Sequence, residues 1–151
     1  MGDIGNLTAI SLVCETAGVF RRRHQTKDFA DRIDQVMAAL FVTDERERME
    51  RLEEHLAFDF VYVSPSAVID GPLGLSDAFV HYRHDDWRHA SLRRTSIVDL
   101  HHAFFRYSWE RRENDATTME GWSFGTVNPN GLISRIVSFD GLLAHLPVNR
   151  N

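Results

Sequence analysis

The sequence predicts an α+β fold, in which helices pack on one face of a curved antiparallel sheet. Apolar residues recur at helical spacing over residues 28–40 and again over 43–56. The pattern changes to period two near residue 58, and from residue 92 onward strand patterns alternate with turn signals. A run of helices followed by a run of strands is typical of this class.

The first two helices are predicted from their apolar stripes and from acids at their starts. Asp28 can cap the first helix, whose stripe is Phe29, Ile33, Val36, Met37 and Leu40. The second opens at residues 43–45, with an inner stripe of Met49, Leu52 and Leu56. Its charged side chains are expected to face water: Arg46, Arg48, Glu50 and Glu53.

The middle of the chain predicts two short strands and a third helix. One strand face is expected to carry Phe58, Phe60, Tyr62 and Ser64, and Pro65 ends that strand. Residues 68–72 indicate a second strand and a turn. Ser76 is the expected cap of the third helix.

The remaining strands are expected as a meander over residues 93–100, 104–111, 119–127 and 132–139. Residues 128–131 (Asn-Pro-Asn-Gly) form a strong hairpin signal. On the second of these strands, Phe105, Tyr107 and Trp109 alternate with Arg106 and Glu110, and we expect the aromatic face to point inward.

Composition excludes several functional classes. The net charge of −5 and the pI near 5.9 argue against a nucleic-acid surface. The single Cys14 rules out an internal disulfide framework and favours the cytoplasm, and no apolar run is long enough to cross a membrane. We expect an N-terminal arm over residues 1–26, one domain over 27–146 and a tail over 147–151.

Several motifs follow one another in a recognisable order. They occupy residues 62–65 with Gly71, residues 96–102 with 106–109, and then residues 121–125, 130–133 and 138–140. In this order they resemble the elements "Y-x-D-P … G", "vd-x-HH … rf-x-W" and "G-x-D … dGrI … gFxD" of the SnoaL-like, nuclear transport factor two-like family. The likeness extends over about residues 28–143.

The resemblance implies a cone-shaped sheet roofed by three helices around a mostly apolar pocket, and a homodimer formed through the outer face of the sheet. Relatives include polyketide cyclases, ketosteroid isomerases, epoxide hydrolases and dehydratases, so the fold does not fix the function. It implies neither a cofactor nor a metal, and a small hydrophobic molecule as the binding partner.

Two positions depart from the family pattern. Ser64 and Ser123 stand where isomerase and cyclase relatives carry catalytic Asp residues. A serine hydroxyl is no base near neutral pH, so that mechanism does not carry over unaided. Asp140 is the best-placed remaining carboxylate if its strand keeps its alternation, whereas a bulge near residues 136 and 137 would turn it outward.

Other candidates for proton transfer are Tyr62 and an Asp99–His101 pair, whose side chains share a strand face. Hydrogen bonds at a hairpin corner are the simpler interpretation of that pair, and we prefer it. The predicted pocket residues are Phe60, Ser64, Phe105, Tyr107, Trp109 and Ser123. Their aromatic rings would equally serve as core filler.

Two functions remain open. The first is a cofactor-free isomerase, cyclase or dehydratase that acts on a hydrophobic metabolite by proton transfer. The second is a non-catalytic ligand-binding or dimerisation module, which the serines at positions 64 and 123 favour. We lean toward the first on the resemblance.

Overall fold

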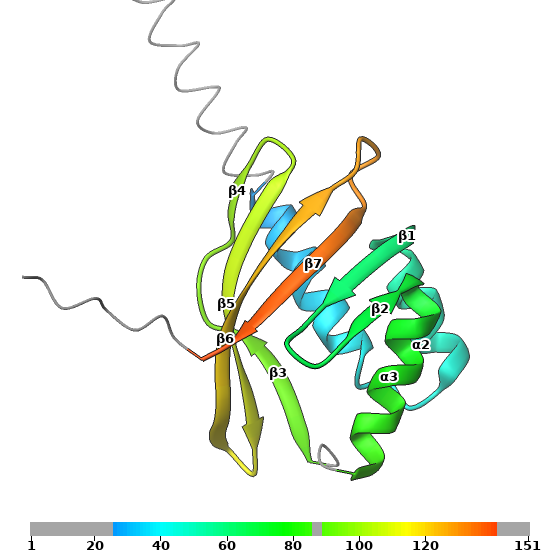
Figure 1. Cartoon of the computed structure of the whole chain (residues 1–151), viewed down its shortest axis with the longest axis vertical. Helices are drawn as coiled ribbons and strands as arrows, with labels where there is room; N and C mark the ends of the chain where they lie inside the picture. The colour runs from blue at the N-terminus through cyan, green and yellow to red at the C-terminus, as the bar shows by residue number, and fades with distance from the viewer. Residues whose placement is uncertain (1–25, 86–88, 142–151) are drawn as a thin grey trace, which may run out of the picture.

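The computed structural model describes residues 26–85 and 89–141 (Figure 1). The predicted arm over residues 1–26, except residue 26 itself, and the tail over 147–151 lie outside the described residues. The first helix covers residues 26–39. Every member of its predicted stripe, from Phe29 to Leu40, is buried. The periodicity of apolar residues therefore identified both this helix and its inner face.

Helix α2 (Glu45–Glu53) begins where its acids predicted. Asp44 is the N-cap, and its carboxylate accepts a hydrogen bond of 2.8 Å from the Glu47 amide. Glu45 and Glu47 lie in the first turn and Arg51 in the last, which suits the helix dipole. One expectation for its outer face is wrong: Arg48 is buried, with 2% of its surface exposed.

Helix α3 (Gly71–Asp85) starts five residues before the predicted cap. Gly71 adopts a positive φ of 73°, and Pro72 follows it in the first turn, where the missing amide hydrogen costs nothing. Ser76 therefore lies inside the helix, fully buried, and caps nothing.

Strand β1 (Leu56–Val63) contains an irregularity that the alternation of its residues does not show. Its pairing with β7 shifts register between Leu56 and Val61. Phe58 is 91% exposed, whereas Phe60 is fully buried, so the two do not share a face as expected. Strand β2 (Val68–Asp70) pairs with the end of β1.

The predicted strand over residues 93–100 is two strands. Strand β3 (Ala90–Arg94) pairs with one end of β5, and β4 (Asp99–His101) pairs with the other end. The chain between them leaves the ladder, and the buried side chain of Val98 anchors it there. Strands β5 (Phe104–Glu113) and β6 (Ala116–Val127) extend their predictions by a few residues, and β7 (Ile133–Asp140) lies one residue later than predicted.

The sheet has the order β2-β1-β7-β6-β5-β3, with β4 beside β5, and it remains open. Strands β1 and β7 are parallel, so the sheet is mixed rather than wholly antiparallel. Register shifts in β5 and β6 accompany its curvature, since a bulge bends a strand. The first helix crosses behind β7 and β1 in Figure 1, and α3 and α2 lie to one side.

Two glycines let aromatic rings lie flat across the sheet. Gly121 pairs with Trp109, and Gly125 pairs with Phe105. A Cβ atom at Gly121 would lie 2.6 Å from Trp109 Cζ2, and one at Gly125 would overlap the Phe105 ring. These close approaches place the two rings under the helices, where they form part of the core.

Among the described residues, no helix is both long enough and apolar enough to cross a membrane.

Candidate functional site

A small cavity lies between the first helix and the concave face of the sheet, with a volume of about 70 Å³. The helices, with Leu40 directly after the first one, contribute the apolar side of its wall: Ile33, Val36, Met37, Leu40, Leu75 and Phe79. The strands contribute Tyr62, Leu92, Tyr107, Trp109, Ser123, Ile136 and Ser138. Tyr62 and Leu92 are partly exposed, so we place the opening beside them.

The register of the sheet brings the polar members of this wall together. Tyr107, Ser123 and Ser138 are direct neighbours across β5, β6 and β7. Tyr62 pairs with Ile136, two residues from Ser138 on the same strand. Directly opposed residues on neighbouring strands point to the same face, so all four hydroxyl groups project into the cone.

These hydroxyl groups form one hydrogen-bonded chain. The Tyr62 hydroxyl bonds to Ser138, and the Tyr107 hydroxyl bonds to Ser123. The two serine oxygens lie 2.7 Å apart, and both serines are buried. The chain satisfies polar groups that would otherwise be costly to bury.

Burial keeps both tyrosines protonated. Loss of water raises the pKa of Tyr107 well above its usual range, and the neighbouring Tyr62 raises it further. Burial also raises the pKa of Tyr62, the negative charge of Asp140 adds to that rise, and the bond to Ser138 opposes it. At neutral pH the two hydroxyl groups are therefore hydrogen-bond donors and not bases.

Trp109 carries a buried hydrogen-bond donor on its indole ring. Its indole Nε1 is buried, and no hydrogen-bond partner is found for it among residues 26–85 and 89–141. The ring lines the cavity. A buried N–H group without a partner costs free energy, so an acceptor atom that comes within reach of Nε1 would be favoured.

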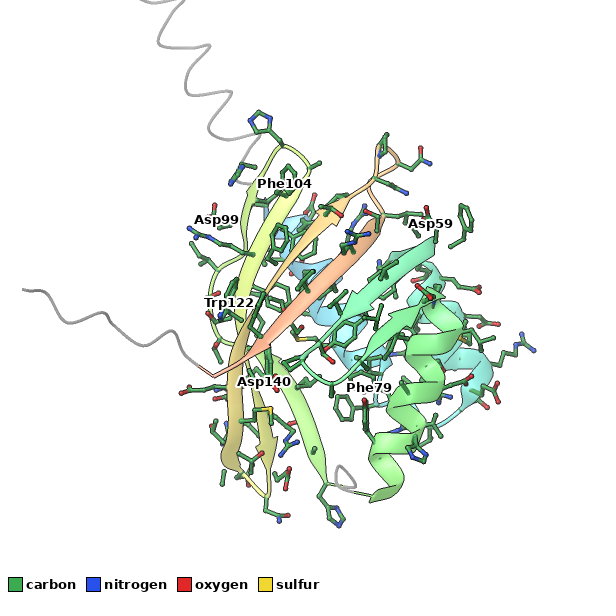
Figure 2. The ribbon with its side chains drawn as sticks, in the orientation of Figure 1. Asp59, Phe79, Asp99, Phe104, Trp122 and Asp140 are labelled. Carbon is green, nitrogen blue, oxygen red and sulfur yellow. The ribbon has the colours of Figure 1, made fainter. Side chains whose placement is uncertain are left out.

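Asp140 lies at the end of β7, as Figure 2 shows. Its strand keeps its alternation, so Asp140 shares the face of Ile136 and Ser138, which line the cavity. The side chain is exposed, and its charge acts on Tyr62. The structure thus places this carboxylate near the cavity opening and not within the wall.

The other predicted site residues lie elsewhere. Phe60 and Phe105 are buried in the core outside the cavity wall. Ser64 lies in the turn after β1, where its amide donates to the Ala67 carbonyl. Asp99 and His101 lie on the outer side of the sheet, and Asp99 forms an ion pair of 2.9 Å with Arg106. The structure therefore separates this pair from Tyr62.

Sequence reasoning missed Ser138 and the helical part of the wall. Ser138 has the same strand parity as Ile136, but nothing in the sequence distinguishes it from a surface serine. Its role depends on β6 and β7 aligning it with Ser123.

A shared metal site is not found in the described ranges, 26–85 and 89–141: no three His, Cys, Asp or Glu side chains gather there. The cavity wall carries neutral donors and apolar groups. Its arrangement suits an uncharged ligand with an acceptor atom.

Comparison of the sequence with protein-family models gives no match, and comparison with curated proteins gives none either. Solved structures do match in fold. A proposed isomerase of the SnoaL-like family from Agrobacterium tumefaciens is 22% identical, with a TM-score of 0.69 over 79% of this chain and 99% of that one.

Two further matches show how widely the fold is used. A proposed polyketide cyclase from Sinorhizobium meliloti has a TM-score of 0.56 and 14% identity, covering 75% of this chain and 97% of that one. A de novo designed protein of the nuclear transport factor 2 fold has a TM-score of 0.57 and 16% identity, covering 76% and 85%. Because a designed scaffold matches as well as a proposed enzyme, the likeness carries the fold alone. The chain therefore has the cone-shaped fold of SnoaL-like and nuclear transport factor 2-like proteins, as its motifs predicted.

Proposed function

We propose that this protein binds a small apolar molecule with a carbonyl group inside the cone. The observation that carries the proposal concerns Trp109, which lines the cavity together with Tyr62 and Tyr107. Its buried indole Nε1 has no hydrogen-bond partner within residues 26–85 and 89–141. The three hydrogen bonds among the four hydroxyl groups use three of their four protons, so one hydroxyl donor remains for a ligand beside Trp109. The rest of the wall is apolar. A carbonyl oxygen is the neutral acceptor that fits such a wall.

The size of the cavity limits what enters it. A cavity of about 70 Å³ is smaller than the 150 Å³ that takes up benzene in an engineered protein core. It holds the carbonyl end of a ligand, and the remainder extends past Tyr62 toward the opening. The cone is thus neither fully open nor filled.

The position of Asp140 supports proton transfer to and from the bound molecule as a further activity. A ligand whose carbonyl oxygen accepts from Tyr62 or Trp109 would direct its α-carbon toward the opening, where Asp140 lies. The carboxylate would take an α-proton, and the donors would stabilise the enolate oxygen. This is the isomerase-like chemistry, with Asp140 in place of the carboxylates missing at Ser64 and Ser123.

The binding proposal is tested with two probes of similar shape, acetophenone and isopropylbenzene, which differ in the carbonyl group. We expect acetophenone to raise the unfolding temperature of the protein more than isopropylbenzene does. Trp109→Phe or Tyr62→Phe should weaken its binding roughly 2- to 12-fold, the value of one neutral hydrogen bond. Trp122→Phe is the matched control, since Trp122 stacks on Phe139 at a centroid distance of 4.4 Å, outside the cavity wall.

Equal affinity for the two probes would contradict the acceptor requirement, and so would equal losses in the Trp109 and Trp122 variants. Catalysis is tested separately by deuterium exchange at the acetophenone methyl group in D2O, followed by NMR. Asp140→Asn should slow the protein-dependent exchange by roughly 10²–10⁴-fold and leave binding in place. Exchange that persists in Asp140→Asn would exclude this carboxylate as the base.

We also propose that two copies associate through the outer face of the sheet. That face carries two stacked aromatic pairs, Phe104 with Phe124 and Trp122 with Phe139. Phe104, Phe124 and Phe139 are each more than a third exposed. Phe124→Glu should yield monomers in sedimentation experiments, whereas Phe58→Glu, on exposed β1, should not. A parent protein that sediments as a monomer would rule out the pairing.

A further inference from the structure

Arg48 is a buried cation that joins three segments. Its side chain comes from α2, and only 2% of the residue is exposed. The guanidinium Nε donates to Ser76 Oγ of α3 at 2.7 Å, and Nη1 donates to the Val42 carbonyl oxygen at 2.8 Å. It therefore holds α2 and α3 against the loop that follows the first helix.

A second guanidinium reaches the same carbonyl oxygen. Arg83 of α3 donates from Nη1 to the Val42 oxygen at 3.2 Å. Its Nε is buried, and no hydrogen-bond partner is found for it within the described part of the chain. The two positive charges thus meet at one neutral acceptor.

Among the side chains that the structure describes, no carboxylate balances the charge at this junction. The ion pairs found among the described residues involve other arginines, and none reaches Arg48 or Arg83. The carboxyl end of the first helix offers about half an elementary charge against two full ones. Burial lowers the pKa of Arg83, and the charge of Arg48 lowers it further.

We propose that Arg48 and Arg83 form a binding site for one phosphate group at the junction of α2 and α3. Two guanidinium groups match the charge of a phosphate dianion. Arg48 contributes its charge, since its Nε and Nη1 already donate to Ser76 and Val42, and Arg83 contributes a donor. Arg83 Nε supplies a buried donor that no acceptor in the described ranges uses. Because Arg48 and Arg83 Nε are buried, the phosphate reaches them by displacing the side chain of Arg83, which is partly exposed. The cavity of the cone has no part in this site.

A purely structural role makes a different prediction. If the two arginines only connect the helices, removing either one would lower stability to the same extent in every buffer. If the two arginines form an anion site, removal of one positive charge should relieve their mutual repulsion when phosphate is absent. We therefore choose Arg83, because Arg48 makes the internal bonds and its loss could prevent folding.

The test compares thermal unfolding of the parent, Arg83→Met and Arg46→Met in sodium phosphate and in sodium chloride of equal ionic strength. Arg46 is the matched control, since it lies on the solvent face of α2 with a side chain that is 87% exposed. We expect a saturable rise in the parent, of roughly 2–8 °C for each kcal/mol of binding free energy. Arg46→Met should keep this rise, and Arg83→Met should lose it.

In chloride, Arg83→Met should unfold at or above the temperature of the parent. Lower stability in both buffers, with an unchanged phosphate response, would overturn the proposal. Equal phosphate responses in all three proteins would also overturn it, because excluded salts stabilise every folded protein. Glycerol 3-phosphate in place of inorganic phosphate then shows whether an esterified group enters the site or only the free ion does.

Discussion

Ser123 and Ser138 face each other across β6 and β7, with their hydroxyl oxygens 2.7 Å apart in the interior of the cone. The pair connects the Tyr62 and Tyr107 hydroxyl groups. A carboxylate at position 123 would enter a wall of neutral groups. The serine pair therefore defines an uncharged interior.

Ser123→Asp should destabilise the protein at pH 7 and much less at pH 4. Burial raises the pKa of a carboxyl group, so the folded variant would hold its proton as the pH rises above about 4, while the unfolded chain would lose its proton. Stability then falls with increasing pH, by about 1.4 kcal/mol for each unit of pKa difference. Urea unfolding at the two pH values measures this.

The control for that change is Ser123→Asn, which has nearly the shape of Asp but carries no charge. The loss of unfolding free energy in Ser123→Asn should be the same at pH 4 and pH 7. If the Asp and Asn variants had equal unfolding free energies at both pH values, water would reach this position more than the buried hydroxyl chain implies.

The two cavity tyrosines should make the protein sensitive to alkali. Because burial raises the pKa of Tyr62 and Tyr107 in the folded state, their contribution to stability is complete below about pH 10. It is lost above that, as the unfolded chain ionises first. Tyr107→Phe should flatten the fall in unfolding free energy above pH 10. Denaturation from pH 8 to pH 11 measures this, and an unchanged slope would contradict it.

Gly121→Ala should be costly because its Cβ would meet both the Phe139 carbonyl oxygen and the Trp109 ring. Strand backbone cannot move aside easily, so we expect a loss of roughly 1–3 kcal/mol in urea unfolding and altered Trp fluorescence. Gly74→Ala in α3 is the matched control. Its Cβ would meet only the Ile69 Cγ2 at 3.2 Å, and alanine favours helix by about 0.5–1 kcal/mol. Similar losses in the two variants would mean that the Trp109 contact is unimportant.

Asp34→Asn should weaken the attachment of the first helix to β3. Asp34 accepts two hydrogen bonds from Arg94, at 2.9 and 2.7 Å, and the Arg94 side chain is 20% exposed. We expect a loss of roughly 0.5–1 kcal/mol in urea unfolding, smaller in 1 M salt. Asp99→Asn should cost less, since its partner Arg106 is 72% exposed. A larger loss at Asp99 would reverse this order.

The elements with strong periodicity were predictable from the sequence, and the irregular ones were not. The first helix and strands β5 to β7 follow their apolar patterns, because one buried face fixes the period of each. Phe58 points outward because the ladder between β1 and β7 shifts register, and that pairing joins segments far apart in the chain. Ser76 caps nothing because Gly71 and Pro72 start α3 earlier.

The sequence by itself determined the fold class, the order of the helices and strands, and the inward aromatic face of β5. Tertiary structure alone decided which polar groups meet. Ser138 joins the hydroxyl chain through its register with Ser123, and the packing of the described residues leaves Trp109 Nε1 without an acceptor among them. Arg48 is buried because α3 and the loop at Val42 close over that side of α2. Local periodicity reports how much of an element is buried, but the partner of a polar atom depends on distant segments.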